Sequence, residues 1–206
     1  MNRLPSDSAD PQLESRISSH PPPHPTRMRL FLGLPIPPEL AQALARRTQT
    51  IELPKGRRTA PENLHLTLVF LGEVADAQLP PIERELSELT FAPFPLKLTS
   101  LNTFPRAGVL IAEIEPTRPL LQLQAKVVVA MARCGFPPED RAYHPHITLA
   151  RFHGPLRLST SQQAPPHGSF TADTVNLYRS HPSPTGANYE ILAQTSTKPV
   201  SQNGKA

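Results

Sequence analysis

The chain has 206 residues, 38% of them hydrophobic, which is enough for one substantial core or two small lobes that share an interface. Its net charge of +4 favours anionic partners but is too small to establish nucleic-acid binding. The single cysteine, Cys134, excludes an internal disulfide and a zinc site built from several cysteines.

The two ends of the chain differ in composition from its middle. Residues 1–27 are rich in proline, serine and charge and lack the apolar segment of a secretory signal, so they predict a disordered arm. Residues 197–206 predict a disordered tail. Residues 28–196 are expected to form a single two-lobed domain. No run of about 18 apolar residues occurs, so we expect no membrane-spanning helix and no membrane partner. The single cysteine fits a reducing cytoplasm, and we expect a cytoplasmic monomer.

The spacing of apolar residues predicts the elements of this domain. Strands are expected at 28–35, 64–72, 94–102, 108–115, 146–152, 170–180 and 188–194. Helices are expected at 37–50, 79–89 and 117–135, the last with Thr117 as a candidate cap. Several strands follow one another without an intervening helix, which favours an α+β fold with mixed or antiparallel sheets over a doubly wound parallel sheet.

One of these strands, in "NLHLTLVFLG" (63–72), carries a histidine among leucines. Because side chains alternate across a strand, His65 and Thr67 point to one side. The apolar side is then formed by Leu64, Leu66, Leu68 and Phe70.

The same arrangement returns in "HPHITLARF" (144–152). Ile147 and Leu149 are expected to face the core, while His146 and Thr148 point away together. A single motif of this kind would be explained by a buried core histidine. Two of them, each with a matching apolar face, favour a functional pair in two halves that face each other.

Two imidazoles and two hydroxyls suit one kind of chemistry. Histidine titrates near pH 6.5, so one ring can accept a proton while the other donates one. Threonine hydroxyls can hydrogen-bond the non-bridging oxygens of a phosphate. The constellation predicts metal-free hydrolysis or transfer of a phosphodiester.

Two other features have competing interpretations. His144 and His146 are candidate ligands of a metal ion, although no carboxylate lies inside either motif. The segment "KGRR" (Lys55–Arg58) just before the first motif is interpreted as a solvated basic turn.

At these residues the sequence resembles the two-histidine phosphoesterases, and in particular the bacterial RNA 2',3'-cyclic phosphodiesterases, also called 2'-5' RNA ligases. The matching segments are "RLFLGLPIPPEL", "PENLHLTLVFLGEV", "YHPHITLARF" and "VNLYRSHPSPTGANYEIL". The resemblance implies a bilobal α+β fold with two mixed or antiparallel sheets, approximate two-fold symmetry around a central basic cleft, and helices on the outside. It also implies hydrolysis of RNA 2',3'-cyclic phosphate to a 2'-phosphomonoester without metal or cofactor, and in some members the joining or cleavage of 2'-5' linkages.

The resemblance also implies roles for individual residues. His65 matches the proton donor and His146 the proton acceptor, while Thr67 and Thr148 match the residues that bind the substrate phosphate. Arg151 matches an arginine that contacts substrate. Strict alternation from His146, however, places Arg151 on the core face, so a bulge or the end of the strand must redirect it unless its role is structural.

Two other functions remain open. The first alternative to a phosphodiesterase is a protein that binds phosphorylated RNA ends without turnover. The second is a metallohydrolase that uses His144 and His146. As a phosphodiesterase its partner is RNA with a 2',3'-cyclic phosphate or a 2'-5' linkage, such as a tRNA fragment or another RNA end, or else a small cyclic nucleotide. The chain has no tryptophan and no aromatic residue in "RRTAPEN", so base contacts are expected from phenylalanine, tyrosine or arginine.

Overall fold

A computed structural model describes residues 27–196 apart from residues 167 and 184–185. The predicted tail at 197–206 and the predicted arm at 1–27, except for its last residue, lie outside the described residues.

The described part of the chain alternates strands with a few helices. The strands are β1 (Arg27–Pro35), β2 (Gly56–Arg58), β3 (His65–Ala75), β4 (Phe94–Phe104), β5 (Val109–Ile114), β6 (His146–Phe152), β7 (Ser169–Ala172), β8 (Thr174–Ser183) and β9 (Gly186–Ser196). The helices are α1 (Pro38–Gln49), α2 (Leu79–Glu88), α3 (Arg118–Arg133) and the short α4 (Thr160–Gln163), with 3₁₀ turns η1 (Pro61–Asn63), η2 (Asp76–Gln78) and η3 (Pro105–Ala107). The α+β class is confirmed. None of the helices in these ranges is long and apolar enough to cross a membrane.

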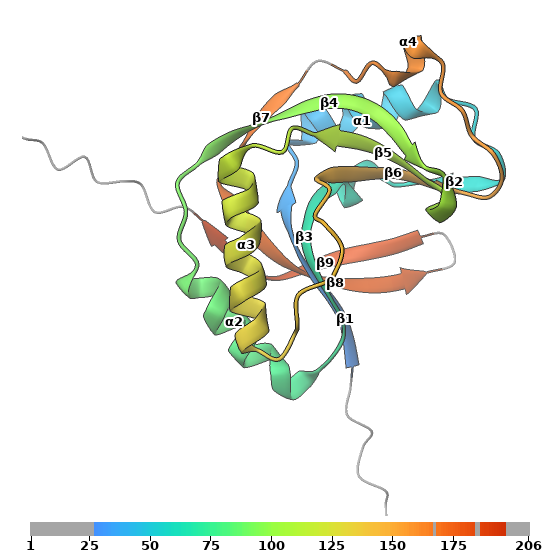
Figure 1. Ribbon diagram of the computed structural model, residues 1–206. Helices are drawn as coiled ribbons and strands as arrows, with labels where there is room; N and C mark the ends of the chain where they lie inside the picture. The colour runs from blue at the N-terminus through green and yellow to red at the C-terminus, as the bar shows by residue number, and fades with distance from the viewer. Residues whose placement is uncertain (1–26, 167, 184–185, 197–206) are drawn as a thin grey trace, which may run out of the picture.

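The strands form one curled sheet in the order β7-β4-β5-β6-β3-β1-β8-β9, with β2 paired to β6 (Figure 1). Each strand pairing seen between described residues is antiparallel. The halves meet where β3 pairs with β6 through Leu66 and Ile147. Where the sequence predicts two sheets, the structure joins them at this bridge into two arms of one sheet.

The two halves repeat one unit, in agreement with the expected two-fold symmetry. The unit is β1-α1-β3 in one half and β5-α3-β6 in the other, and in each the two strands pair and a histidine begins the second. α1 packs against β6 and α3 packs against β3, so each helix covers the central strand of the other half. α2 and α3 lie side by side on the outside, at the left of Figure 1.

The core lies between the sheet and these helices because one face of each element is apolar. In α3, Leu120, Leu123 and Val127 follow the helical spacing and are buried. Alternate residues of β4, including Leu96 and Leu98, are buried in the same way. The sheet therefore has its other face available for polar side chains near the bridge.

Three local predictions are corrected. The strand expected at 170–180 is broken at Asp173 into β7, which pairs with β4, and β8, which pairs with β1, so the chain changes halves there. Lys55–Arg58 was expected as a turn, but most of it is strand β2, whose three exposed residues carry no apolar alternation to predict it. Thr117 lies at the N-cap position of α3, yet its side chain makes no capping hydrogen bond.

Candidate active site

The bridge between the halves brings the two histidine motifs together. Leu66 and Ile147, the residues that follow the two histidines, pair directly across the antiparallel strands, and both are fully buried. Each is flanked on its own strand by the histidine and the threonine of its motif. Because neighbours along a strand point to opposite faces, both histidines and both threonines lie on the other face of the sheet from the core.

The two imidazoles are held in the same way. Nδ1 of His65 lies 2.7 Å from the carbonyl oxygen of Asn63, and Nδ1 of His146 lies 2.7 Å from that of His144. A carbonyl only accepts, so each Nδ1–H donates, and in the neutral ring Nε2 carries the lone pair. The Thr67 hydroxyl lies 3.0 Å from Nε2 of His65. Each ring thus keeps its Nε2 on the side away from its anchoring carbonyl.

The surroundings make both rings weaker bases than free imidazole. Burial, together with the positive charge of His146, lowers the pKa of His65 to about 4, even though a hydrogen bond to the Asn63 carbonyl raises it. Burial also lowers the pKa of His146, again against its carbonyl partner, with additional lowering by nearby positive charges that include Arg151. The charge of His146 acts on His65, so the two rings belong to one electrostatic site.

An aromatic wall surrounds His65. The ring of Phe31 lies 4.6 Å from the imidazole centroid, Tyr189 lies edge-on at 5.2 Å and Tyr178 lies at 5.7 Å. A Cβ at Gly33 would approach the His65 ring to 3.3 Å, so this glycine leaves room for it. The motifs alone did not identify these side chains, because β1, β8 and β9 reach the site only through pairing in the sheet.

A bulge corrects the predicted apolar face of the first motif. Phe70 was assigned to the core with Leu68, but its side chain is 53% exposed and Leu71 is buried instead. The pairing of β1 with β3 shifts between Leu32 and Gly33, which leaves Leu68 as an extra residue. Beyond it the alternation is reversed, so Phe70 lies on the histidine side, 5.9 Å from the ring of Phe31.

A second bulge redirects Arg151 in the same manner. In the pairing of β5 with β6, Leu110 is opposite Ala150 and Ile111 is opposite Thr148, so Leu149 is the extra residue. Ala150 is therefore buried and Arg151 is exposed on the face that carries His146. Of the two ways of redirecting Arg151 that the sequence leaves open, a bulge or the end of the strand, the bulge is the one that occurs.

Side chains before each motif fasten it to another strand. The Tyr143 hydroxyl donates to the carbonyl of Thr67 at 2.9 Å, which ties the loop before the second motif to the first. Asn63, before the first motif, donates from Nδ2 to the carbonyl of Ala187 in β9 at 2.6 Å. These bonds hold the motif strands and the aromatic wall in a fixed relation.

The proposed metal ligand His144 has another partner. Its Nε2 lies 3.2 Å from a carboxylate oxygen of Glu113. Burial raises the pKa of Glu113, but hydrogen bonds from Ser100 and Asn102 and the nearby His144 lower it below its usual value overall. Within the described ranges, no group of three or more His, Cys, Asp or Glu side chains is placed to hold a metal ion.

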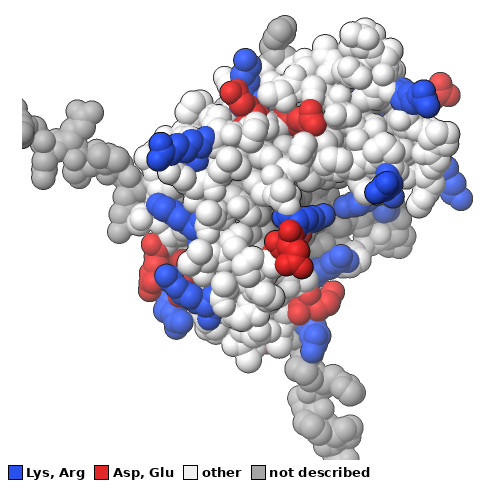
Figure 2. Space-filling view, viewed as in Figure 1, with Lys and Arg blue, Asp and Glu red and all other residues white. Residues whose placement is uncertain are grey.

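A basic pocket of about 620 Å³ lies at the end of β6, the strand that begins with His146. On the face seen in Figure 2, Lys and Arg side chains lie around a hollow right of centre, with acidic side chains beside it. The pocket's basic and histidine side chains are Lys55, Arg57, Arg106, Arg151 and His153.

Two glycines shape this pocket by packing on the backbone of Phe152. A Cβ on Gly56 would lie 2.8 Å from Cα of Phe152, and one on Gly108 would lie 2.1 Å from its carbonyl oxygen. Gly108 also has a φ of +61° and accepts the Phe152 N–H at 2.7 Å. The end of β6, and with it Arg151, is held between these two contacts.

We therefore expect Gly108→Ala to destabilise the protein by about 3 kcal/mol, since a left-handed backbone and a backbone clash act together. Gly72→Ala is the matched control, because Gly72 has a φ of +71° with nothing within 4 Å of its Cβ position. It should cost only about 1–2 kcal/mol, the cost of the conformation alone. Denaturant unfolding of both variants measures the difference in the free energy of unfolding. Equal losses of stability would contradict a close contact between Gly108 and the backbone of Phe152.

The comparisons with known proteins agree on one family. The 2'-5' RNA ligase superfamily matches residues 36–183. The RNA 2',3'-cyclic phosphodiesterase of Bacillus subtilis is 34% identical over 73% of this chain and 83% of its own, and that of Escherichia coli is 32% identical over 74% and 86%. The crystal structure of E. coli LigT complexed with 3'-AMP superposes with a TM-score of 0.74 at 28% identity, over 84% of this chain and 99% of LigT.

Proposed function

The chain belongs to the 2'-5' RNA ligase superfamily, and from this membership we propose that it hydrolyses RNA 2',3'-cyclic phosphate ends to 2'-phosphomonoesters. The observation that carries the proposal is the pair of equivalent imidazoles, each with Nδ1 held by a carbonyl, on either side of the bridge between the halves. Two such rings supply both proton transfers of the reaction.

In the proposed reaction, water attacks phosphorus while the bond from phosphorus to the 3' oxygen breaks. Nε2 of His146 accepts the proton of the water, and Nε2 of His65 donates a proton to the leaving 3' oxygen. The products are a 2'-phosphate and a free 3'-hydroxyl, so atoms and charge balance. The hydroxyls of Thr67 and Thr148 hydrogen-bond the non-bridging oxygens, where negative charge is stabilised.

The low pKa of His65 requires the substrate to take part in its protonation. A ring with a pKa of about 4 is neutral near pH 7 in the free protein. An anionic phosphate between the rings favours their charged forms, which brings a proton to His65 as the substrate binds. Arg151, on the same face as His146, contributes positive charge that holds the phosphate.

This assignment predicts an acidic optimum for kcat/KM. The active free protein has one ring charged and one neutral, so the bell-shaped profile is centred between the two pKa values of the pair. Both are lowered from 6.5, which places the maximum below pH 6.5. The kcat maximum should lie at higher pH, because bound phosphate raises both values. Initial rates at saturating and at low substrate between pH 4 and 8 test this, and a kcat/KM maximum above pH 7 would contradict it.

The function itself is tested with an oligoribonucleotide that ends in a 2',3'-cyclic phosphate, incubated in EDTA. We expect turnover and a product with a 2'-phosphate, which is distinguished from the 3' isomer by chromatography against both standards. Binding without turnover would favour the binder of RNA ends. Activity lost in EDTA and restored by zinc would favour the metallohydrolase.

Both histidines and both threonines come from one chain, so we propose that the protein acts as a monomer. Its proposed partner is RNA in the cytoplasm, with no metal and no cofactor.

A further inference from the structure

The residue two positions before each motif histidine supplies more than a backbone carbonyl. We propose that Glu113 is a positioning residue: its carboxylate holds the side chain of His144, so that the carbonyl of His144 keeps the ring of His146 in one orientation and one tautomer. The inference deepens the proposed function and rests on it, since it takes His146 to be one of the two groups that transfer protons.

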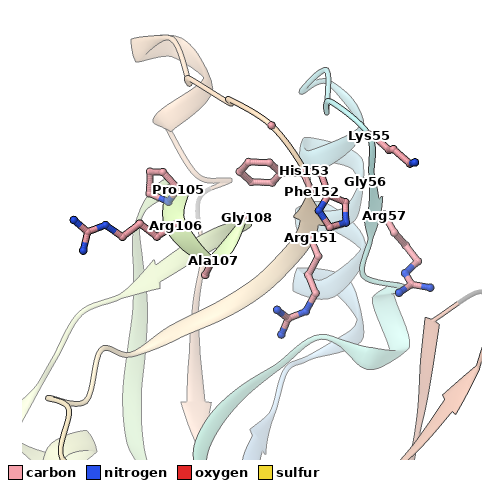
Figure 3. A pocket seen from close by; sticks show the side chains of 11 residues that line it. Lys55, Gly56, Arg57, Pro105, Arg106, Ala107, Gly108, Arg151, Phe152 and His153 are labelled. Carbon is pink, nitrogen blue, oxygen red and sulfur yellow. The ribbon is translucent and has the colours of Figure 1, made fainter.

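The first argument is the place of Glu113 beside the motif histidine. Glu113 and His146 are cross-strand partners on the histidine face, while their neighbours Ala112 and Ile147 pair on the buried face. At the other end of β6 lies the basic pocket, where Figure 3 shows the side chain of Arg151. Positive charge there suits an anionic substrate, whereas a carboxylate opposite His146 repels one. The role of Glu113 is therefore sought in what it holds and not in contact with substrate.

The second argument is that three side chains donate to the carboxylate. Ser100 donates from Oγ to Oε2, Asn102 donates from Nδ2 to Oε1 at 3.3 Å, and Nε2 of His144 lies 3.2 Å from Oε1. A carboxylate only accepts, so His144 is the donor in its bond. The side chain of Glu113 is 22% exposed and that of His144 is 52% exposed. The better buried carboxylate is thus a fixed anchor for the more exposed ring.

The third argument is a bulge in β4 that brings these donors to the histidine face. Leu98 is buried before the bulge and Leu101 after it, so the alternation changes phase. Between the pairings of these two leucines with β5, β4 has two residues where β5 has only Glu113. Without the extra residue, Ser100 and Asn102 would point into the core. The strand is irregular at the point where the carboxylate needs its partners.

The fourth argument is that the other half of the molecule repeats the arrangement. Nδ1 of His65 donates to the carbonyl of Asn63, whose own side chain donates to the carbonyl of Ala187. In the second motif His144 has the position of Asn63, and a carboxylate replaces the backbone carbonyl as the anchor. Two chemically different anchors at equivalent positions indicate that each motif histidine needs its carbonyl partner held. Residues with fixed side chains of this kind keep a catalytic group in its productive geometry.

A movement of His144 reaches His146 by two routes. The carbonyl of His144 accepts from Nδ1 of His146 at 2.7 Å. Phe104 packs edge-on against both rings, with centroids 5.3 Å from His144 and 5.1 Å from His146. Release of His144 therefore weakens the bond that keeps the proton on Nδ1 and the lone pair on Nε2. A base that is misplaced in this way is slower even when the substrate is bound.

The test measures kcat and KM on an oligoribonucleotide with a 2',3'-cyclic phosphate end. Glu113→Ala and His144→Ala should each lower kcat about tenfold, and Glu113→Ala should not raise KM, because it removes a charge that repels the phosphate. The combined variant should lose no more than either single variant, since both act through one bond. Glu113→Gln retains an oxygen for Nε2 of His144 and an amide that can donate to Ser100, so it should keep most of kcat.

Glu190→Ala is the matched control, because it removes a pair of the same kind, with His181 at 2.8 Å in the β8–β9 hairpin, and should leave kcat unchanged. Thermal unfolding checks that each variant is folded, and if Glu113→Ala does not fold, His144→Ala carries the comparison. NMR of the ring nitrogens of His146 gives a readout without turnover. Glu113→Ala and His144→Ala should each reduce the population with the proton on Nδ1, and Glu113→Gln should restore it.

Three results would each overturn the proposal: an equal loss of kcat in Glu113→Gln and Glu113→Ala, losses that multiply in the combined variant, or an unchanged tautomer of His146 in the alanine variants. If the wild-type protein does not hydrolyse the oligoribonucleotide, the proposed function fails. The NMR comparison then still decides whether Glu113 positions His146.

Discussion

Replacement of either motif histidine by alanine is expected to lower kcat/KM by a factor on the order of 10²–10⁴, the usual worth of a positioned acid or base. His65 and His146 are held by equivalent bonds to carbonyls, so the two losses should be similar in size. The double variant should lose less than the product of the two, because the rings act as a pair. Rates measured on an oligoribonucleotide with a cyclic phosphate end provide the comparison.

The fold of these variants is the necessary control. Both rings lie off the apolar face, but His65 packs on Phe31, with ring centroids 4.6 Å apart, so some stability is lost when it is removed. His65→Gln retains more of the side-chain volume than alanine and should keep the cooperative unfolding transition while activity remains low. Near-normal turnover in either single variant would refute the paired mechanism. A His65→Gln protein that fails to fold would make the histidine a core residue, and the test would then rest on His146→Ala.

Removal of the threonine hydroxyls is expected to have the next largest effect. Thr67→Val and Thr148→Val keep the branched shape but remove a hydrogen-bond donor to the phosphate, and each should lower kcat by about 10²–10³. Thr67→Ser and Thr148→Ser restore the hydroxyl and should recover most of the rate. Steady-state kinetics of all four variants distinguish a hydrogen bond from the hydroxyl to the phosphate from an effect of side-chain packing. Equal losses in the serine and valine variants would show that the methyl group, and not the hydroxyl, is what the site requires.

The Thr67 variant has a second expected signature. Its hydroxyl lies 3.0 Å from Nε2 of His65 and can donate to the neutral ring. The same hydroxyl can accept from the charged ring, and that charge-assisted hydrogen bond is the stronger of the two, so the pKa of His65 should fall in Thr67→Val. Titration of the ring by NMR would detect the change, and Thr148→Val should leave the His65 titration where it is.

The sequence by itself determined which segments form the main strands and helices, and which side chains of the two motifs can carry out chemistry. Strand and helix signals are local, since they come from alternation or helical spacing along a few residues, and β1, β3, β6, α1 and α3 all lie close to their predicted ranges. His65 and His146 could be singled out because a polar side chain repeated in an apolar strand is visible in the letters alone. The α+β class followed from the order of the strands.

What only the tertiary structure decided is where those side chains point and what surrounds them. The bulges at Leu68 and Leu149 place Phe70 and Arg151 on the histidine face. Each bulge is one extra residue in a strand relative to the strand that it pairs with, so it depends on both strands. The break at Asp173 and the pairing of β2 also depend on strands distant in the sequence. Periodicity in one segment carries no information about its partner, so the aromatic wall, the direction of Arg151 and the pairing of Arg57 with it emerge only when the sheet is assembled.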